Sequence, residues 1–558
     1  MHAETVLLLV LAAVAVIVAA RWLAGRTGLP SAALLTVAGL VYAQLPGPNL
    51  TLDPGIVLAV LLPPLLYSAA LDSSLIAIRA NMRTVVGLSV LLVVVTALVV
   101  GAGFALWVPG ATLAAGIALG AAVAPPDPVA ALAVGRRVGL PPRLVTLIQG
   151  EGLLNDATAL TLLSVAVTAA VGDGYSTWSA LGQFAVSAAG GVAAGLAVAY
   201  GIRPLRRLRR DPLSSNAISL ATPFVAYLLA ESVHVSGVLA VVVAGLVIAH
   251  NAPYWQSGET RLQTDAVWRL VDFLLEGVVF LLIGQQLPAV IGGLGAHPVS
   301  TVVLAAGITV GSVLLIRPLW LWLTEHAPQA LHVRLSGAPG ADDDDDPTTP
   351  PRQLSGREIT VLSWAGTRGV ITLAAVFTIP VATDAGEPFP GRDLLLFCAF
   401  LTVLVTLVGQ GVTFAPLVRR LGLRADAADA ARLRNQARMA AVEAGLDRLD
   451  ELQAEQHDHV DDAAIASVRA ALRTRLDRYR RRLEVLGDAE GAVPLSPEYE
   501  AALRVRRAVI DAERAELLRW RDLGRLPDDG LRTLERELDH QENLLPARPA
   551  EVRTARPR

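Results

Sequence analysis

The fold is decided by two short stretches, VAPPDPVA at residues 123–130 and GEGLLND at residues 150–156. Both place carboxylates inside runs that are apolar enough to span a bilayer. A charged carboxylate at the centre of a bilayer costs about 2.5–3.5 kcal/mol, so acids at that depth usually face a partner or a water-filled cavity. We therefore expect Asp127 and Asp156 to lie at a functional site.

Three prolines surround Asp127 and predict that a spanning helix breaks there. Proline has no amide hydrogen, and it disfavours helical geometry in the residue before it. A broken helix at membrane depth is tolerated where its free carbonyls line a cavity, and such carbonyls suit a cation. The alternative is a proline kink beside an acid that merely bonds a neighbouring helix. Asp156, on the next predicted helix, favours the cation site.

The composition indicates a polytopic membrane protein with a soluble part. The chain has 558 residues, of which 53% are hydrophobic and 17% charged. All 47 basic residues are arginine, a bias typical of genomic base composition, and it does not indicate nucleic-acid binding. The single cysteine, Cys398, lies in an apolar run, so we expect no disulfide within the chain, no metal–thiolate site and no cofactor.

The sequence predicts an all-α protein with about thirteen spanning helices. The first, Thr5–Ala20, has no basic residue before it and is followed by Arg21 and Arg26, unlike a signal peptide. The other predicted segments are Ser31–Gln44, Gly55–Ile78, Thr84–Val108, Thr112–Val134, Leu144–Val171, Leu181–Ile202, Ala217–Ser232, Ser236–Ala249, Val267–Ile291, Val299–Leu323, Glu358–Val381 and Leu394–Leu417.

Arginines fall on alternate loops between these segments. One set of loops holds most of them, including the cluster between Arg203 and Arg210, whereas the opposite set holds only Arg392. Because short cytoplasmic loops carry an excess of basic residues, we expect the amino terminus outside and the carboxyl terminus in the cytoplasm of a cell-membrane protein.

A second helix break is predicted at SWAGTRGV, residues 363–370. There Arg368 is flanked by Gly366 and Gly369 in the middle of the twelfth apolar segment. A buried arginine needs a counter-ion, and we predict Glu151; an arginine that snorkels to the interface is the alternative. Asp156 lies about 140° around its helix from Glu151, so one acid can pair while the other faces a cavity. One broken helix in each half is typical of an inverted-repeat transporter.

Five motifs carry a resemblance to a known family. In the order and spacing of these motifs, the chain resembles the bacterial sodium/proton antiporters of the monovalent cation:proton antiporter-1 family, over nearly the whole membrane part. The motifs are VAPPDPVAALAVGRR (123–137), GEGLLNDATAL (150–160), PFVAYLLAESVHVSGVLAVVVAGLV (223–247), FLLEGVVFLLIGQQLP (273–288) and SWAGTRGVITLA (363–374).

The resemblance implies a thirteen-helix fold, with crossed broken helices in a mobile core domain and a second domain that makes a homodimer. It implies exchange of Na⁺ or Li⁺ for H⁺ by alternating access across the lipid bilayer, in pH homeostasis. In this reading Asp156 binds the cation and the proton, and Asp127 and the backbone near Pro126 are further Na⁺ ligands. Asn155 stands where the electroneutral branch has asparagine, and Glu151 and Arg368 correspond to the core ion pair.

Three positions depart from the family pattern. Many members have threonine at Pro126, serine at Gly152 and glutamate at Ser68. Gly152 shares a helix face with Asp156, so water or backbone must supply the oxygen that a serine would offer. Asp72, one turn after Ser68, is a candidate replacement for the missing acid; a surface carboxylate at a helix end is the alternative. The departures bear on ion choice, and a K⁺/H⁺ antiporter is the alternative function.

Other acidic residues have weaker signals. For Glu231 and Glu276, a pore-lining or ion-pair role and a place at the membrane interface are both open. The run Asp342–Asp346 is typical of a solvated linker, because contiguous acids lack the spacing that a divalent-metal site needs.

The composition changes after Leu423. Residues 1–423 are predicted to form the transmembrane antiporter domain and residues 424–558 a cytoplasmic helical tail. Alanine, leucine, glutamate and arginine recur there at helical spacing. The predicted tail helices are Ala427–Glu455, Asp461–Leu486 and Pro497–Leu523.

Two aspartates at membrane depth are also compatible with an enzyme. Intramembrane aspartyl proteases also use two membrane aspartates, which share a proton to activate water. They resemble one another in a Gly-x-Gly-Asp motif, but Asp127 follows two prolines and Asp156 follows Leu154 and Asn155. We therefore expect a transporter and not an enzyme.

Overall fold

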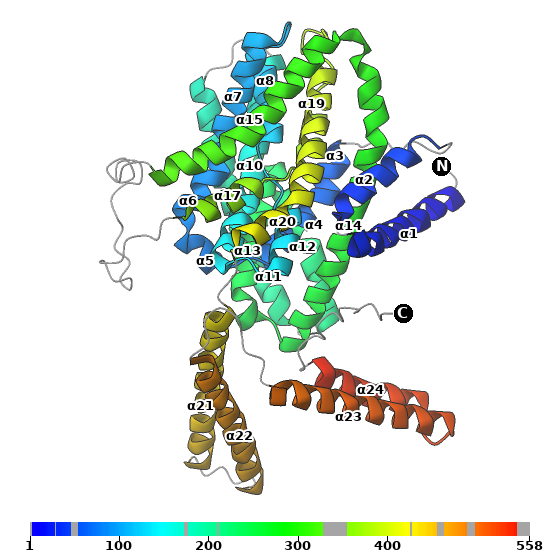
Figure 1. Ribbon diagram of the computed structural model, residues 1–558, viewed down its shortest axis with the longest axis vertical. Helices are drawn as coiled ribbons and strands as arrows, with labels where there is room; N and C mark the ends of the chain where they lie inside the picture. The colour runs from blue at the N-terminus through cyan, green and yellow to red at the C-terminus, as the bar shows by residue number, and fades with distance from the viewer. Residues whose placement is uncertain are drawn as a thin grey trace. The chain divides into compact units, whose positions relative to one another are not determined.

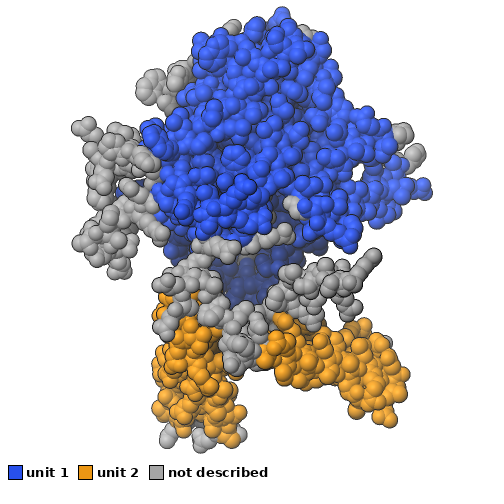
Figure 2. Space-filling view, in the orientation of Figure 1, with its two compact units in different colours: residues 1–425 blue, residues 426–558 orange. Residues whose placement is uncertain are grey.

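The computed structural model describes residues 3–27, 29–45, 54–171, 177–208, 211–326, 354–423, 427–454, 462–487 and 497–543. These residues form helices joined by turns, and no β-strand occurs among them (Figure 1). The chain divides into two compact units, Met1–Ala425 and Asp426–Arg558, which are coloured separately in Figure 2. The predicted linker Asp342–Asp346 lies outside the described residues.

Unit 1 is built from apolar helices that follow the predicted segments. They are α1 (Ala3–Thr27), α2 (Ser31–Tyr42), α3 (Pro54–Ile56), α4 (Leu62–Leu71), α5 (Leu75–Ala80), α6 (Met82–Val86), α7 (Leu92–Trp107), α8 (Leu113–Val123), α9 (Pro128–Val138), α10 (Pro142–Val171), α11 (Thr177–Leu208), α12 (Pro212–Ser232), α13 (Gly237–Trp255), α14 (Gly258–Gly292), α15 (Val299–His326), α17 (Gly356–Trp364), α18 (Val370–Phe377), α19 (Arg392–Val405) and α20 (Gly411–Leu421). Three π-helical turns and one 3₁₀ turn continue or end these helices: η1 (Val57–Leu61), η2 (Gly87–Leu91), η4 (Thr406–Gln410) and η3 (Gly293–Ala296).

Unit 1 is a multi-pass membrane unit by the length and composition of its helices. Among the described residues, eight helices are long and apolar enough to cross a membrane, and three shorter apolar helices accompany them. Large apolar side chains such as Leu7, Leu106 and Val299 are exposed, as side chains that face lipid would be. The total of about thirteen spans stays a prediction.

Both predicted helix breaks are confirmed. In the first half, α8 ends at Val123 and α9 begins at Pro128, with Asp127 as its N-cap. The Asp127 Oδ1 atom accepts a hydrogen bond of 2.9 Å from the Val129 amide, which replaces one partner that the helix start lacks. In the second half, α17 ends at Trp364 and α18 begins at Val370.

Glycine permits the close packing of α2 on α14. A Cβ atom added at Gly39 would meet the backbone carbonyl of Leu281, and one added at Gly284 would meet the backbone carbonyl of Thr36. Both obstacles are backbone atoms, which cannot rotate away as side chains do. Small residues of this kind are common where membrane helices approach closely.

Gly284→Ala is therefore expected to lower the thermal stability of the protein, because α2 and α14 must move apart. Overpacking of this kind typically costs about 1–3 kcal/mol. Gly307→Ala in α15 is the matched control, since no atom lies within 4 Å of a Cβ added there. Melting temperatures in detergent measure the difference. Equal melting of the two variants would contradict the close packing.

Unit 2 consists of four helices, α21 (Ala427–Ala454), α22 (Asp462–Gly487), α23 (Pro497–Asp522) and α24 (Asp528–Asn543). α21 packs on α22, and α23 packs on α24 (Figure 1). The first three helices agree with the predicted segments to within one residue, whereas α24 was not predicted. Buried apolar side chains, among them Val442 and Leu476, make the first hairpin's core.

Candidate functional site

The two helix breaks cross and satisfy each other's backbone. The Asp127 amide donates to the Thr367 carbonyl at 2.6 Å, and the Thr367 hydroxyl donates to the Asp127 carbonyl at 2.9 Å. Residues between half-helices have no intrahelical partners for these groups, and membrane depth offers little water to replace them. The crossing therefore joins α8, α9, α17 and α18 into one body.

Arg368 is held by backbone carbonyls at the crossing. Its Nε donates to the Val123 carbonyl at 2.9 Å and its Nη2 to the Ala124 carbonyl at 3.0 Å. Its Nη1 also donates to the Gly366 carbonyl. The last carbonyls of a helix lack donors and lie at the negative end of the helix dipole. The guanidinium group thus neutralises the end of α8 and also bonds the segment that follows α17.

The counter-ion of Glu151 is Arg317 from α15, so the predicted pairing of Glu151 with Arg368 is wrong. Both Arg317 terminal nitrogens donate to Glu151, with Nη2 to Oε2 at 2.8 Å, and both side chains are almost fully buried. The Arg317 Nε also donates to the Leu362 carbonyl at 2.9 Å. The prediction failed because the ends of the broken helices occupy Arg368, whereas a third helix supplies the charge that Glu151 needs.

Asp156 is the buried acid without a protein partner. Its side chain on α10 is 4% exposed, and it makes no hydrogen bond or ion pair with another residue in the described ranges. It lies close enough to Asp127 for their charges to interact. A buried carboxylate in this state needs a proton or a cation to neutralise it.

Asn155 and Pro126 adjoin the two aspartates. The Asn155 Nδ2 atom donates to the Pro126 carbonyl at 2.9 Å, which connects α10 to the first helix break. Its Oδ1 atom is buried and has no hydrogen-bond partner. The structure thus brings together four of the predicted site residues, and their oxygens are the ligands that hard cations prefer.

Gly152 is explained by packing. A Cβ atom at this position would overlap the ring of Pro128 at the start of α9. Glycine therefore permits α10 to approach α9 closely. The position offers no side-chain oxygen to the site, which is the departure noted in the sequence.

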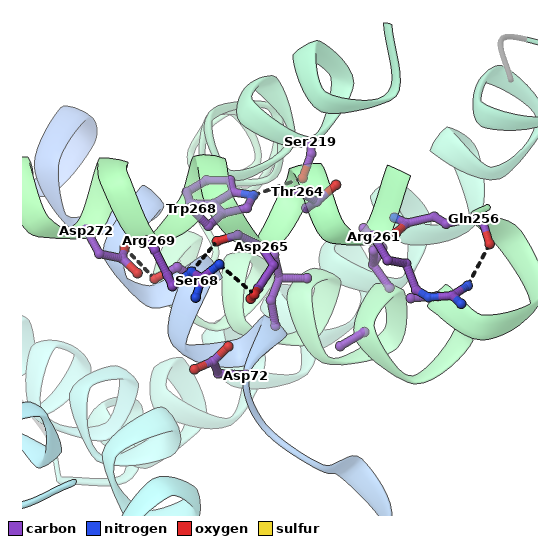
Figure 3. A pocket seen from close by; sticks show the side chains of 14 residues that line it. Ser68, Asp72, Ser219, Gln256, Arg261, Thr264, Asp265, Trp268, Arg269 and Asp272 are labelled. Atoms are coloured by element: carbon purple, nitrogen blue, oxygen red, sulfur yellow. Dashed lines mark hydrogen bonds and ion pairs between the residues drawn. The ribbon is translucent and has the colours of Figure 1, made fainter. Parts of the chain in front are cut away.

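A cavity of about 170 Å³ lies between α4, α12, α13 and α14 (Figure 3). Its wall contains Ser68 and Asp72, and the Ser68 hydroxyl donates to Asp272 Oδ1 at 2.6 Å. Asp272 was not predicted as a site residue, although an acid in a spanning segment was the available signal. Many family members have a glutamate at the position of Ser68, and here Asp272 of α14 places a carboxylate beside that position.

Glu276, one turn beyond Asp272 on α14, continues a row of acids toward the crossing. It lies close enough to interact electrostatically with Asp272, with Asp127 and with Arg21 of α1. Glu276 therefore fits the pore-lining or ion-pair alternative. Glu231 differs, since it is exposed at the end of α12 and fits the interface alternative.

Comparisons with known proteins agree with this arrangement. Residues 10–420 match the family model described as sodium/hydrogen exchanger, transmembrane. An uncharacterised Na⁺/H⁺ exchanger of Mycobacterium bovis is 33% identical over 549 residues, which cover 96% of this chain and 95% of that protein. The Na⁺/H⁺ antiporter ApNhaP of Aphanothece halophytica is 30% identical over 403 residues, covering 72% and 71%.

The fold is similar to that of a solved antiporter. The sodium proton antiporter MjNhaP1 of Methanocaldococcus jannaschii at pH 8 superimposes with a TM-score of 0.57 and 17% sequence identity. The superposition covers 74% of this chain and 99% of MjNhaP1. A likeness at this identity concerns the fold.

Proposed function

Since this chain belongs to the transmembrane sodium/hydrogen exchanger family, and is a cation/proton antiporter and not an enzyme, we propose that it exchanges Na⁺ for H⁺ at Asp156. The observation that carries the proposal is the burial of this carboxylate without a partner among the described residues. A proton and a cation can each neutralise it, but not both at once. Their competition couples the two fluxes.

The remaining ligands come from the crossing. Asp127 supplies a second carboxylate, and the carbonyl of Pro126 and the free Oδ1 of Asn155 supply neutral oxygens. Water completes the shell at the position where Gly152 has no side chain. The broken backbone is fixed by Arg368 and Thr367, so these ligands are positioned before the cation arrives.

We propose that alternating access uses the same bonds. Because the two helix breaks are tied to each other, the crossing moves as one body past α14 and its neighbours. It moves only when Asp156 is neutral, since a bare buried carboxylate is costly in the membrane. We further propose a homodimer in the cell membrane, with the amino terminus outside and unit 2 in the cytoplasm.

K⁺ is the alternative cation. A relative from Bacillus pumilus, 31% identical over 381 residues that cover 66% of this chain and 55% of that protein, is named a sodium, potassium, lithium and rubidium/H⁺ antiporter. Purified protein in liposomes with an internal pH dye tests the proposal when Na⁺, Li⁺ and K⁺ are added separately. We expect proton movement with Na⁺ and Li⁺. Movement with K⁺ alone would favour the alternative, and no movement with any cation would contradict antiport.

Electroneutral exchange is proposed because Asn155 carries no proton to release, so the adjacent pair Asn155–Asp156 has one titratable carboxylate. One proton then leaves for each Na⁺ bound. Clamping the membrane potential of the liposomes at different values tests this, and the exchange rate should not change. A rate that follows the potential would contradict electroneutrality.

Asp272→Asn is expected to raise the Na⁺ concentration needed for half-maximal exchange by about tenfold, because the half-buried Asp272, one turn from Glu276, attracts cations toward Asp127. The maximal rate should change little, since Asp272 is not a proposed ligand. Asp265→Asn is the matched control: Asp265 lies two turns earlier on the same cavity wall, and its side chain is 56% exposed. If both variants needed the same Na⁺ concentration for half-maximal exchange, the proposal that cations pass through this cavity would be contradicted.

A further inference from the structure

The hairpin of α21 and α22 carries more positive charge toward one end and more negative charge toward the other. Seven arginines occur from Arg469 to Arg482, whereas the stretch from Asp447 to Asp462 holds seven acidic residues and one arginine. The whole chain is nearly neutral, with a formal net charge of −3. The arginines are therefore concentrated locally and do not reflect a basic chain.

α21 and α22 run antiparallel, so the arginine-rich half of α22 lies beside the start of α21. The Asn435 Nδ2 atom donates to the Tyr479 carbonyl at 3.1 Å, and the Arg432 Nε atom to the Leu486 carbonyl at 2.8 Å. The acidic residues Asp447, Asp450 and Glu451 lie toward the other end of α21. One end of the hairpin is thus basic, and we call it the basic end, defined by Arg434, Arg475, Arg478 and Arg481.

The four arginines of the basic end are available to a partner. Each is exposed, and none forms a hydrogen bond or ion pair with a residue that the structure describes. Other arginines of α22 are already used: Arg469 pairs with Asp450 at 2.6 Å, and Arg480 with Glu443 at 3.5 Å. Leu433, beside Arg434, is 70% exposed and adds an apolar contact.

The start of α21 follows the last apolar span closely in the sequence. The apolar span Arg392–Leu421 ends unit 1, and α21 begins at Ala427. The five intervening residues can span at most about 3.5 Å each. Predicted topology places this connection on the cytoplasmic side, the leaflet surface that carries a negative potential.

We propose that the basic end binds the anionic phospholipid headgroups of the membrane that holds unit 1. Guanidinium groups match phosphate oxygens in charge and geometry. Each arginine near an anionic surface favours association by about fivefold, so the four act strongly together. The acidic end is repelled by the same surface, so the charge pattern also orients the hairpin.

Lipid contact at Leu433 tests the proposal in the full chain. Leu433→Cys is labelled with an environment-sensitive dye, because the native Cys398 is buried and unlabelled wild-type protein serves as the blank. The protein is placed in nanodiscs of phosphatidylcholine alone or mixed with phosphatidylglycerol, each containing a headgroup-linked quencher. We expect severalfold stronger quenching with phosphatidylglycerol. It should be lost near 1 M salt, where the screening length is about 3 Å.

Two quadruple variants distinguish an effect of the basic end from an effect of the total positive charge. Replacing the four basic-end arginines by glutamine should abolish the phosphatidylglycerol effect. The matched control replaces four exposed arginines of the second hairpin and should retain it; these are Arg506, Arg525, Arg532 and Arg536. Equal quenching in the two lipid mixtures would overturn the proposal, as would an effect that survives the first variant. If the basic end bound an acidic protein or a second copy of the chain instead, quenching would be equal in the two lipid mixtures.

Discussion

Asp156→Asn is expected to abolish cation-dependent proton movement while the protein stays folded. The amide keeps the shape of the side chain but can neither release a proton nor offer a charge to Na⁺. Its neighbours remain in place, because no bond between Asp156 and another described residue is lost. The internal pH dye in liposomes measures transport, and size-exclusion chromatography with thermal melting measures folding.

Asp265→Asn is the control for this replacement, since it removes an aspartate from an exposed part of α14. It should retain full exchange. Asp127→Asn should weaken cation affinity or also abolish exchange, because Asp127 is the second proposed carboxylate ligand. Full exchange by Asp156→Asn would assign coupling to a different residue.

Breaking the Glu151–Arg317 pair is expected to have the largest effect on stability. Removing one partner leaves an uncompensated charge in a site that is almost fully buried, which costs about 3–5 kcal/mol. Arg317→Met should therefore lower the melting temperature and the folded yield strongly. The exposed pair Arg269–Asp265 is the control, because such pairs contribute only about 0.3–0.5 kcal/mol within a helix.

A double-mutant cycle isolates the interaction between the two side chains. Glu151→Gln together with Arg317→Met leaves no unpaired charge, so the double variant should be more stable than the sum of the single losses predicts. Purely additive losses would contradict the pairing. The same cycle for Glu151 and Arg368 should show weaker coupling, since carbonyls hold Arg368.

Much of the site was predictable because it follows from local chemistry. The prolines around Asp127 and the glycines beside Arg368 break helices wherever the helices pack, and both breaks lie where the sequence placed them. The association of Asn155 with Pro126 also agrees with the predicted site. The two breaks depend on residues that are near one another in the chain, whereas Asn155 and Pro126 are 29 positions apart and their shared site was implied by the family resemblance.

Partners from distant helices were not predictable in the same way. Arg317 carries the same signal as Arg368, an arginine inside an apolar segment, but the sequence does not say which arginine reaches Glu151. Only the packing of α15 against α17 and α10 decides it. Asp272 likewise meets Ser68 across 204 positions of sequence. The helix α24 was missed although Leu531, Leu534 and Leu538 recur in it at helical spacing.

Calorimetric titration of Na⁺ into the detergent-purified protein at a series of pH values tests the central claim most directly. If proton and cation compete for Asp156, apparent affinity should rise by about tenfold for each pH unit while the site is protonated, then level off. Titrations in buffers of different protonation enthalpy should show one proton released per Na⁺ on the rising part and none on the plateau. Affinity that is independent of pH, with no proton release, would contradict the account.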